Sequence, residues 1–332
     1  MSSIIKVTSV IIGTIIGAGF ISGQEIYSFF NKYGATGQIG IIIAISLISI
    51  IIYKTLKIIN EHKIESYEEF LEKTIKSKSQ IITYTIKNII NIFLVISFLI
   101  MCSAFSTYCY ENYQIPLIIG GTIISILSYI ILKKDVKTII KLNTLLMPIL
   151  IIFILIIGIR VANWNNVSFS SASVLPTIIK GILYANYNCI VLIPMLITLK
   201  KEIKNKFQIK KIAIISFIIM YLLTEIIYTS QNKIEITQSE MPMLEISKQI
   251  SKSCITIYGL ITGIAIFTSA ISAGHSLMNN TKNSLKIKQI LTIILCAIAI
   301  PISTISFASL VNLAYPVFGV LGIIQIFFIL KT

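Results

Sequence analysis

The stretch GTIIGAGFISGQEI, residues 13–26, decides the fold expected for this chain, because it sets four glycines and a carboxylate in an apolar run. Glycine inside a helix costs about 1 kcal/mol relative to alanine, and a charge at membrane depth costs roughly 2.5 kcal/mol or more. Glycine also permits an unwound turn. Because no water reaches the bilayer core, the backbone groups that such a turn frees must form hydrogen bonds with other parts of the protein or with a ligand. We therefore expect a membrane helix that breaks at Gly17–Gly19 beside Glu25. Close helix packing through Gly13-x-x-x-Gly17 is the alternative.

The composition of the whole chain is that of a membrane protein. Its 332 residues are 55% apolar and 12% charged, with a mean hydropathy of +0.90, whereas soluble domains are about a quarter charged. Much of the surface should therefore face lipid. The five cysteines lie scattered in apolar runs, and there are two histidines. We expect neither a disulfide framework nor a zinc site.

Apolar segments long enough to cross a bilayer recur along the chain, since roughly 20 helical residues span its hydrocarbon core. The last two share a run without formal charge, residues 289–330, which we divide near Ser306–Asn312. The sequence predicts an all-α integral membrane protein with ten transmembrane helices, at 4–30, 36–58, 80–110, 115–132, 138–160, 174–199, 210–231, 251–279, 288–307 and 310–330.

Lysine and arginine residues indicate the orientation of these helices. With a cytoplasmic N-terminus, 22 of the 28 basic residues lie on the inner side and 6 on the outer side. This bias predicts that both termini are cytoplasmic and that the span count is even. The basic excess then reflects orientation, and no nucleic-acid partner is expected. The longest loops contain residues 65–73, an expected inner amphipathic helix, and 235–250, an expected partly helical outer cap, although both could be plain connectors.

Ten spans divide into five plus five, which predicts one transmembrane domain, residues 1–332. Repeat one covers about 4–161 and repeat two about 174–330; an odd number of spans per repeat inverts the second relative to the first. The second repeat opens with YANYN, Tyr184–Asn188, where we expect another break ahead of Pro194. Exposed half-helix ends suit a substrate carboxylate at their N–H groups and a cation at their carbonyl groups.

Three stretches carry a family resemblance. GTIIGAGFISGQEIYSFFNKYGATGQIG (13–40) resembles the start of the YkvI-type bacterial membrane proteins, LYANYNCIVLIPML (183–196) their sixth helix, and TSAISAGHSL (268–277) their eighth. That family in turn resembles the amino acid–polyamine–organocation superfamily, which has the LeuT fold. The resemblance implies a bacterial cytoplasmic membrane location and a 5+5 inverted repeat with helices 1 and 6 broken. It also implies that helices 1, 2, 6 and 7 move against helices 3, 4, 8 and 9.

The same resemblance suggests site residues. Gly17, Ala18 and Gly19 match the unwound part of helix 1, where relatives hold the carboxylate of the ligand. Thr268 and Ser269 fall where sodium-coupled relatives place two hydroxyls, which makes them candidate sodium ligands, although such hydroxyls often bond to the preceding turn. The substrate-binding candidates are Gly17, Ala18, Gly19, Phe20, Tyr184, Ala185, Asn186, Tyr187, Asn188 and Tyr108; the ion-coupling candidates are Thr268, Ser269, Ser272, Thr14, Glu25 and Glu225.

Two acids within the spans have alternative interpretations. Glu25 could serve as a cation or proton site or contact a substrate amine, or it could pair with another buried polar group. Glu225 is a candidate for proton coupling. Lys180, at the outer end of 174–199, could instead form a structural bridge to either acid.

The function expected from these features is secondary transport of a small amino acid or related zwitterion by alternating access. Sodium is the first coupling ion to consider and a proton the second; no other cofactor is expected. A ligand-sensing receptor of the spore-germination permease type, without net flux, is the alternative. An enzyme is not expected, because the spans lack His-Glu-x-x-His, Gly-x-Ser-x-Gly and paired aspartates.

Overall fold

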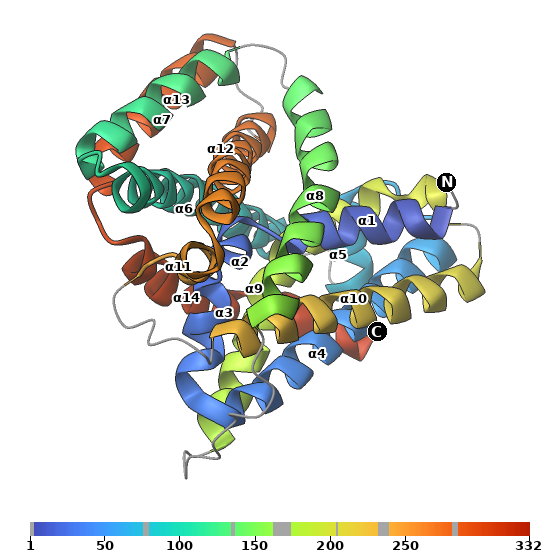
Figure 1. Cartoon of the computed structure of the whole chain (residues 1–332). Coiled ribbons are helices and arrows are strands. Elements are labelled where there is room, and N and C mark those ends of the chain that lie inside the picture. Colours follow the sequence, from blue (N-terminus) through green and yellow to red (C-terminus); the bar gives the residue numbers. More distant parts are fainter. Residues whose placement is uncertain are drawn as a thin grey trace.

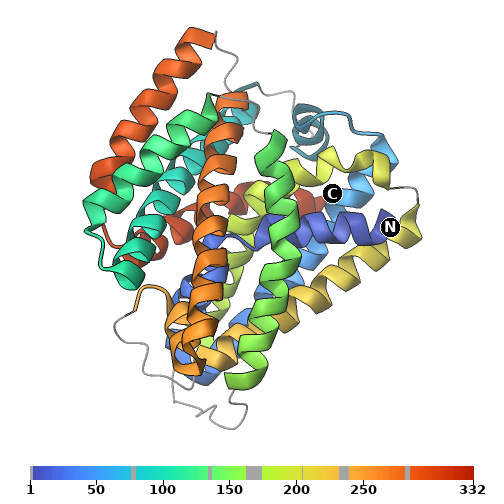
Figure 2. The same ribbon diagram turned by 45° about the horizontal axis from the view of Figure 1, so that its top comes forward.

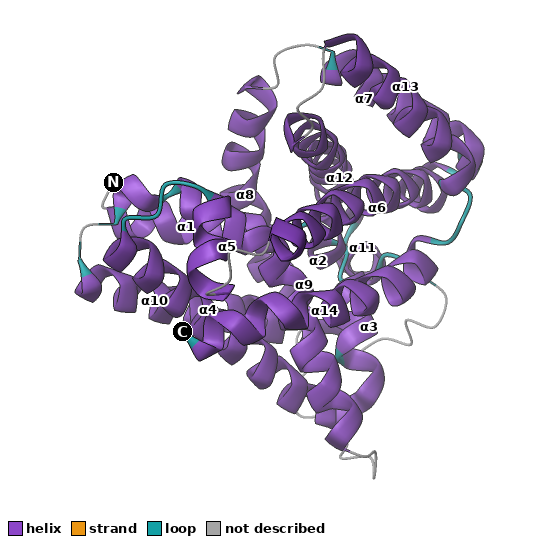
Figure 3. Ribbon diagram, turned by 180° about the vertical axis from the view of Figure 1, so that it is seen from behind, coloured by secondary structure: helices purple, strands orange, loops and turns teal. Residues whose placement is uncertain are grey.

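A computed structural model describes residues 3–75, 80–133, 137–161, 174–203, 205–231, 239–280 and 285–332. Within these ranges the protein consists of helices and short connections and has no strand (Figure 3). The elements are α1 Ser3–Ile15, α2 Ala18–Ile21, α3 Gln24–Phe29, the 3-10 helix η1 Asn31–Thr36, α4 Gly37–His62, α5 Tyr67–Ile75, α6 Gln80–Tyr113, α7 Leu117–Leu132, α8 Lys137–Val161, α9 Val174–Thr198, the 3-10 helix η2 Lys200–Glu202, α10 Lys206–Gln231, α11 Pro242–Ile250, α12 Lys252–Asn280, α13 Leu285–Ile302 and α14 Phe307–Lys331.

Each predicted span coincides with a helix, or, for the first, with the run α1–α2–α3. Six described segments are long and apolar enough to cross a membrane: Asn31–His62, Tyr84–Tyr113, Val174–Thr198, Lys206–Gln231, Lys252–Met278 and Phe307–Lys331. Shorter apolar helices occur at Ser3–Ile15, Leu117–Leu132 and Pro148–Val161. Large apolar side chains face outward along these helices, such as Ile92 at 54% exposure. The protein is therefore a helical membrane protein, and ten crossings stay a prediction.

The helices pack in two groups. In one, α4 packs against α9 and α10, and α1 lies on α10. In the other, α12 packs against α6, and α7 packs against α6 and α13. Figures 1 and 2 show α7 and α13 together on the side of the molecule away from α10. Between the groups, α14 contacts α9 and α6, and α8 contacts α12 and α10.

A seam of glycines brings α4 and α14 close to opposite sides of α9. A Cβ atom on Gly181 of α9 would lie 2.5 Å from the carbonyl oxygen of Gly40 in α4. Cβ atoms on Gly319 and Gly322 of α14 would lie 2.6 and 2.8 Å from carbonyl oxygens of α9. Such small-residue contacts let membrane helices pack backbone against backbone.

The predicted break in the first span is confirmed. Helix α1 ends at Ile15, Gly17 is extended with φ −91° and ψ −176°, and the chain then forms the four-residue helix α2. A second interruption follows at Gly23, whose φ of +82° lies in the left-handed region that favours glycine.

The predicted break at Tyr184–Asn188 is wrong, because α9 runs as one helix through these residues. Residues 182–193 contain neither glycine nor proline, so nothing local opens the helix. Two of the polar side chains there find partners without unwinding: Tyr187 donates to Glu25, and Asn188 Nδ2 donates to the carbonyl oxygen of Tyr184 at 3.0 Å. The hydroxyl of Tyr184 and Oδ1 of Asn186 stay buried without a hydrogen bond to the described residues. The glycine seam on both sides of α9 further favours a regular helix.

The described contacts between loops join segments that the lysine pattern predicts to lie on the same side of the membrane. Described ion pairs between segments join regions predicted to lie on the inner side: Lys6–Glu202, Lys200–Glu65, Lys206–Glu61 and Lys87–Glu68. On the predicted outer side, the carboxylate of Glu111 accepts hydrogen bonds from Ser239 Oγ and from the amide of Glu240. The two termini lie toward the same side in Figures 1, 2 and 3. Which side faces the cytoplasm stays a prediction.

Both loop helices that the sequence predicted are present. Residues 65–73 fall largely within α5, which packs against α6 and α14. Residues 239–250 contain α11, which packs against α12 and α10, while 235–238 lie outside the described residues. The last two long helices separate between Ile302 and Phe307, slightly earlier than expected.

Candidate functional site

A cavity of about 280 Å³ lies at the break between α1 and α2. Helices α1, α2, α3 and α6 from the first half of the chain and α9, α12 and α14 from the second half contribute to its wall. The lining residues are Gly13, Thr14, Ile15, Ile16, Gly17, Ala18, Glu25, Phe93, Leu94, Ser97, Met101, Tyr187, Asn188, Val191, Ser269, Ser272, Ala273, Ser276 and Tyr315.

The cavity gathers about half of the predicted site residues. Four substrate-binding candidates line it, namely Gly17, Ala18, Tyr187 and Asn188, and so do four ion-coupling candidates, Thr14, Glu25, Ser269 and Ser272. The other predicted residues are absent from its wall: Gly19, Phe20, Tyr184, Ala185, Asn186, Tyr108, Thr268 and Glu225. The first five of these are buried in the packing of α2 and α9.

Glu25 supplies the carboxyl group of the described cavity wall. Its side chain is 4% exposed, and its Oε2 atom accepts a hydrogen bond of 2.5 Å from the hydroxyl of Tyr187. The ring of Tyr187 stacks on that of Tyr315, with the centroids 4.7 Å apart. A carboxyl group, two phenol rings and several hydroxyls therefore share this small space.

The three glycines around the break, Gly17, Gly19 and Gly23, differ in their surroundings and backbone conformation. A Cβ atom on Gly17 would meet nothing within 4 Å, so this residue borders open space. A Cβ atom on Gly19 would fall on the side chain of Glu25, 2.7 Å from its Cγ and 2.8 Å from its Cδ. Gly19 thus provides the room that the carboxyl group occupies. Gly23 supplies the positive φ of the second turn.

Three hydrogen bonds join neighbouring helices to the carbonyl groups of the Ile21–Gly23 turn, which is the predicted outer end of this broken helix. The hydroxyl of Tyr258 donates to the carbonyl oxygen of Ile21 at 2.5 Å. The amide of Met243 donates to the carbonyl oxygen of Ser22 at 2.9 Å. Gln231 Nε2 donates to the carbonyl oxygen of Gly23 at 2.8 Å. These donors come from α12, α11 and α10; those to Ile21 and Ser22 satisfy carbonyl groups that the turn frees from the helix, while the carbonyl of Gly23 also accepts from the amide of Tyr27 at 3.0 Å. The cavity lies on the α1 side of this covered turn.

The hydroxyl pair predicted to hold sodium does not converge on the cavity. Thr268 Oγ1 lies 3.1 Å from the carbonyl oxygen of Ala265, one turn earlier in α12, and does not line the wall. Ser272 Oγ donates to the carbonyl oxygen of Thr268 at 2.8 Å, and Thr14 Oγ1 to that of Val10 at 2.8 Å. Hydroxyl groups of helical Ser and Thr often bond to the preceding turn in this way, which is the alternative to sodium binding named above.

The predicted bridge from Lys180 to an acid is not formed. Its ammonium lies 5.6 Å from the centroid of the Phe29 ring. Glu225 instead accepts a hydrogen bond of 2.8 Å from Gln38 Nε2, at the packing of α10 against α4. Both partners of the proposed bridge thus have other contacts.

Tyr108, another substrate-binding candidate, does not line the cavity. Its hydroxyl is 3.3 Å from that of Tyr113, at the outer end of α6. Its ring packs where a Cβ atom on Gly263 of α12 would stand.

Sequence reasoning missed several lining residues, including Tyr315, Ser97 and Ser276. Tyr315 had a signal, since it stands in the polar interruption NLAYPVFG (312–319) of an apolar run. The serines had none, because serine is frequent in membrane helices and the side that it faces depends on tertiary packing.

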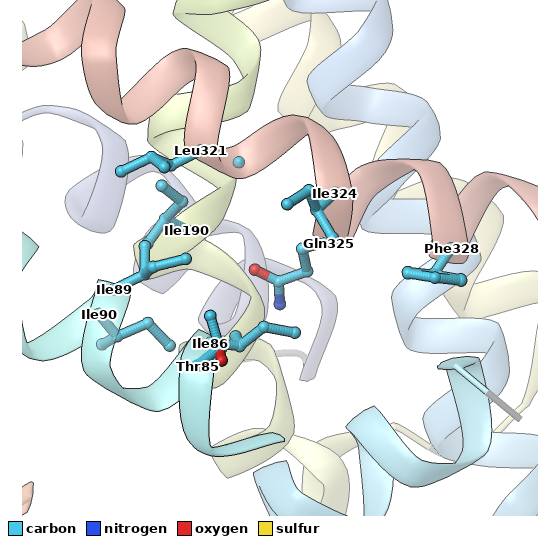
Figure 4. A pocket seen from close by; sticks show the side chains of 10 residues that line it. Thr85, Ile86, Ile89, Ile90, Ile190, Leu321, Ile324, Gln325 and Phe328 are labelled. Atoms are coloured by element: carbon cyan, nitrogen blue, oxygen red, sulfur yellow. The ribbon is translucent and has the colours of Figure 1, made fainter. Parts of the chain in front are cut away.

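A second cavity, of about 310 Å³, lies between α6, α9 and α14 (Figure 4). Isoleucines, Leu321 and Phe328 form most of its wall. Its amide group, from Gln325, donates to the hydroxyl of Tyr67 at 2.8 Å. Because its described wall carries no charged group, this lateral cavity does not suit a zwitterion.

Comparison with known proteins also indicates a membrane protein. The chain is 26% identical to a Bacillus subtilis (strain 168) protein described as the uncharacterized membrane protein YkvI, over 93% of this chain and 90% of that protein. The chain is similar to YkvI. It is also 21% identical to the uncharacterized protein YyaD of the same strain, over 94% of this chain and 92% of that protein. No model of a known protein family matches the chain. The resemblance to YkvI-type proteins is thus confirmed.

Proposed function

We propose that this protein is a secondary transporter that moves a small amino acid or related zwitterion by alternating access, coupled to sodium or protons. The observation that carries the proposal is the broken first helix, which borders a polar cavity lined by both halves of the chain. Substrate sites of secondary transporters lie near the bilayer midplane, at the interface of two repeats and beside discontinuous helices.

The packing of the helices supports a LeuT-like arrangement. Helices α1, α4, α9 and α10 are the first two spans of each predicted repeat, and they pack together. Helices α6, α7, α12 and α13 are the next two of each repeat, and they form the second group. This is the division into a moving bundle and a scaffold that the family resemblance implies. The unbroken α9 departs from that pattern, so the break in the first span alone would supply freed backbone groups.

The covered turn suggests which state the structure represents. The predicted outer side of the break is closed by Tyr258, Met243 and Gln231, whereas the cavity lies on the predicted inner side. In the proposed cycle this is an inward-facing state. The outward-facing state would separate α11 from the Ile21–Gly23 turn.

The size and lining of the cavity limit the substrate. At about 280 Å³ it lies near the lower end of ligand pockets. Phe93, Met101 and Val191 form an apolar part, while Glu25 and the serine hydroxyls form a polar part. We propose that Glu25 binds the ammonium group of the substrate and that the apolar part receives a short side chain.

Uptake into vesicles tests the proposal. Purified protein would be reconstituted, and uptake of a mixture of labelled amino acids measured with a sodium gradient, with a proton gradient and with neither. Gly17→Leu should abolish uptake because its side chain fills the cavity, where an added Cβ meets no atom. Ile324→Phe, which fills the lateral cavity instead, is the matched control and should retain uptake. Amino-acid binding without uptake would refute transport and favour the receptor.

A further inference from the structure

The geometry of Glu25 points to a competition, and we infer that a proton and the ammonium group of the ligand exchange at this carboxyl group. In the empty cavity Glu25 holds the proton; an arriving ammonium group displaces it. The inference rests on the proposed function of the cavity as the ligand site, and it names the event that couples ligand to proton there.

The carboxyl group is held in place on two sides. Tyr187 donates its hydroxyl hydrogen to Oε2 at 2.5 Å. The absent side chain of Gly19 leaves the space that the rest of the carboxyl group fills. Because the group is fixed at the wall and borders the cavity, a ligand reaches it without rearrangement of the helix.

The surroundings provide no positive charge for an ionised Glu25. No lysine, arginine or histidine lines the described cavity wall. The titratable groups nearest the carboxyl are phenols, Tyr184 and Tyr187 of α9 and Tyr315 of α14. None of the charged groups on the elements packed against α3 lines the described wall; they are Lys32 of η1, Lys180 of α9, Lys206, Lys210, Lys211 and Glu225 of α10, Glu245 and Lys248 of α11, and Lys331 of α14.

A buried carboxylate without a positively charged partner is costly, so such a group is neutralised by a proton or by a cation. The cavity offers both, but one at a time. In the exchange, the carboxyl O–H bond breaks and its proton leaves to water through the open side of the cavity. The carboxylate that remains accepts a hydrogen bond from the incoming ammonium. Charge balances, since one positive charge enters and one leaves.

The tyrosine pair would favour the ammonium form of the ligand. The rings of Tyr187 and Tyr315 both border the cavity, and aromatic faces attract cations. Tyr187 keeps its hydrogen bond to Oε2 in both states. Because each ligand displaces a proton, its Kd should fall about tenfold for each unit rise in pH while the ligand stays protonated and Glu25 is protonated in the empty protein.

The test uses methylammonium chloride on the full chain in lipid, with potassium chloride as the control for ionic strength. Infrared difference spectra would report a protonated carboxyl group, and a pH indicator in weakly buffered solution would report released protons. We expect methylammonium to remove a carboxyl C=O band and to release a proton for each ion bound. Glu25→Gln should lose both signals. Glu225→Gln, which changes an acid outside the cavity wall, should keep them.

The outcomes separate this inference from the proposed function. A carboxyl band that methylammonium leaves unchanged, or proton release that persists in Glu25→Gln, overturns the exchange even if vesicles accumulate amino acids. Proton release that depends on Glu25, in vesicles that take up no amino acid, supports the exchange and overturns transport.

Discussion

Replacing Gly19 by alanine gives a direct test of the site geometry, because the added methyl group has one obstacle. It would lie 2.7 Å from Cγ and 2.8 Å from Cδ of Glu25, too close for any rotamer that keeps the carboxyl group in place. Overpacking of this kind costs about 1–3 kcal/mol. Alanine recovers up to about 1 kcal/mol through its helix propensity in α2. With that recovery subtracted in full, the expected net loss of stability is about 0–2 kcal/mol.

The assay is unfolding of the purified protein in mixed micelles with increasing denaturing detergent. Gly17→Ala is the matched control, two residues away and also at the break. Its methyl group meets no atom within 4 Å, and its φ of −91° suits any residue. Loss of glycine flexibility in the unfolded chain should make this variant neutral or slightly more stable, by about 0.4–1 kcal/mol.

A second background isolates the contact between residues 19 and 25. In a Glu25→Ala chain the obstacle is gone, so Gly19→Ala should cost little, and the two substitutions should be strongly non-additive. If Gly19→Ala is as stable as Gly17→Ala, or costs the same without the carboxyl group, the packing argument is refuted.

The remaining predictions concern the covered turn, the loops and the membrane sides. Gly23→Ala should destabilise the protein more than Gly17→Ala in the same assay, because left-handed backbone costs a residue with a Cβ about 1–2 kcal/mol. The added methyl group would also press on Met243, 3.3 Å from its amide nitrogen. Equal stability of the two variants would contradict this prediction. Gln231→Ala removes one of the two hydrogen bonds that the carbonyl oxygen of Gly23 accepts, the other coming from the amide of Tyr27 at 3.0 Å, and should cost about 0.5–1.5 kcal/mol. A cysteine at position 22 in a chain freed of its native cysteines should then react faster with an impermeant thiol reagent from outside. Glu65→Gln removes the partner of Lys200, which holds the pKa of that exposed carboxyl below its usual value; stability should change little, and a large loss would refute this. Tags at either terminus should be accessible from the cytoplasm alone, and an accessible tag outside would overturn the orientation.

The helices could be predicted from sequence because their signal is local. Runs of apolar residues near 20 in length mark each long helix, and the ion pairs between segments join regions that the lysines predict to lie on one side. The break at Gly17 could be predicted for the same reason. Glycine weakens a helix wherever it stands, and few contacts elsewhere are needed to open it.

The error at Tyr184–Asn188 shows where local reasoning ends. Asparagine and tyrosine inside an apolar run signal a need for polar partners, but a regular helix can meet that need, as Asn188 does with the carbonyl of Tyr184. Only about half of the predicted site residues line the cavity, because the sequence does not show which way a helix faces. A residue lines the cavity when its side of the helix faces inward, and that depends on packing between distant segments, as for Ser97, Ser276 and Tyr315.

The glycine seam limits how this molecule can change shape. Where Gly40 meets Gly181, and where Gly319 and Gly322 meet α9, main chains touch with no side chain between them to tilt or slide. Dispersion forces fall steeply with separation, so a shear of α9 against either neighbour would lose these contacts together. Any large motion should therefore carry α4, α9 and α14 as one rigid body, with the bending concentrated in the few residues on either side of Gly17 and Gly23.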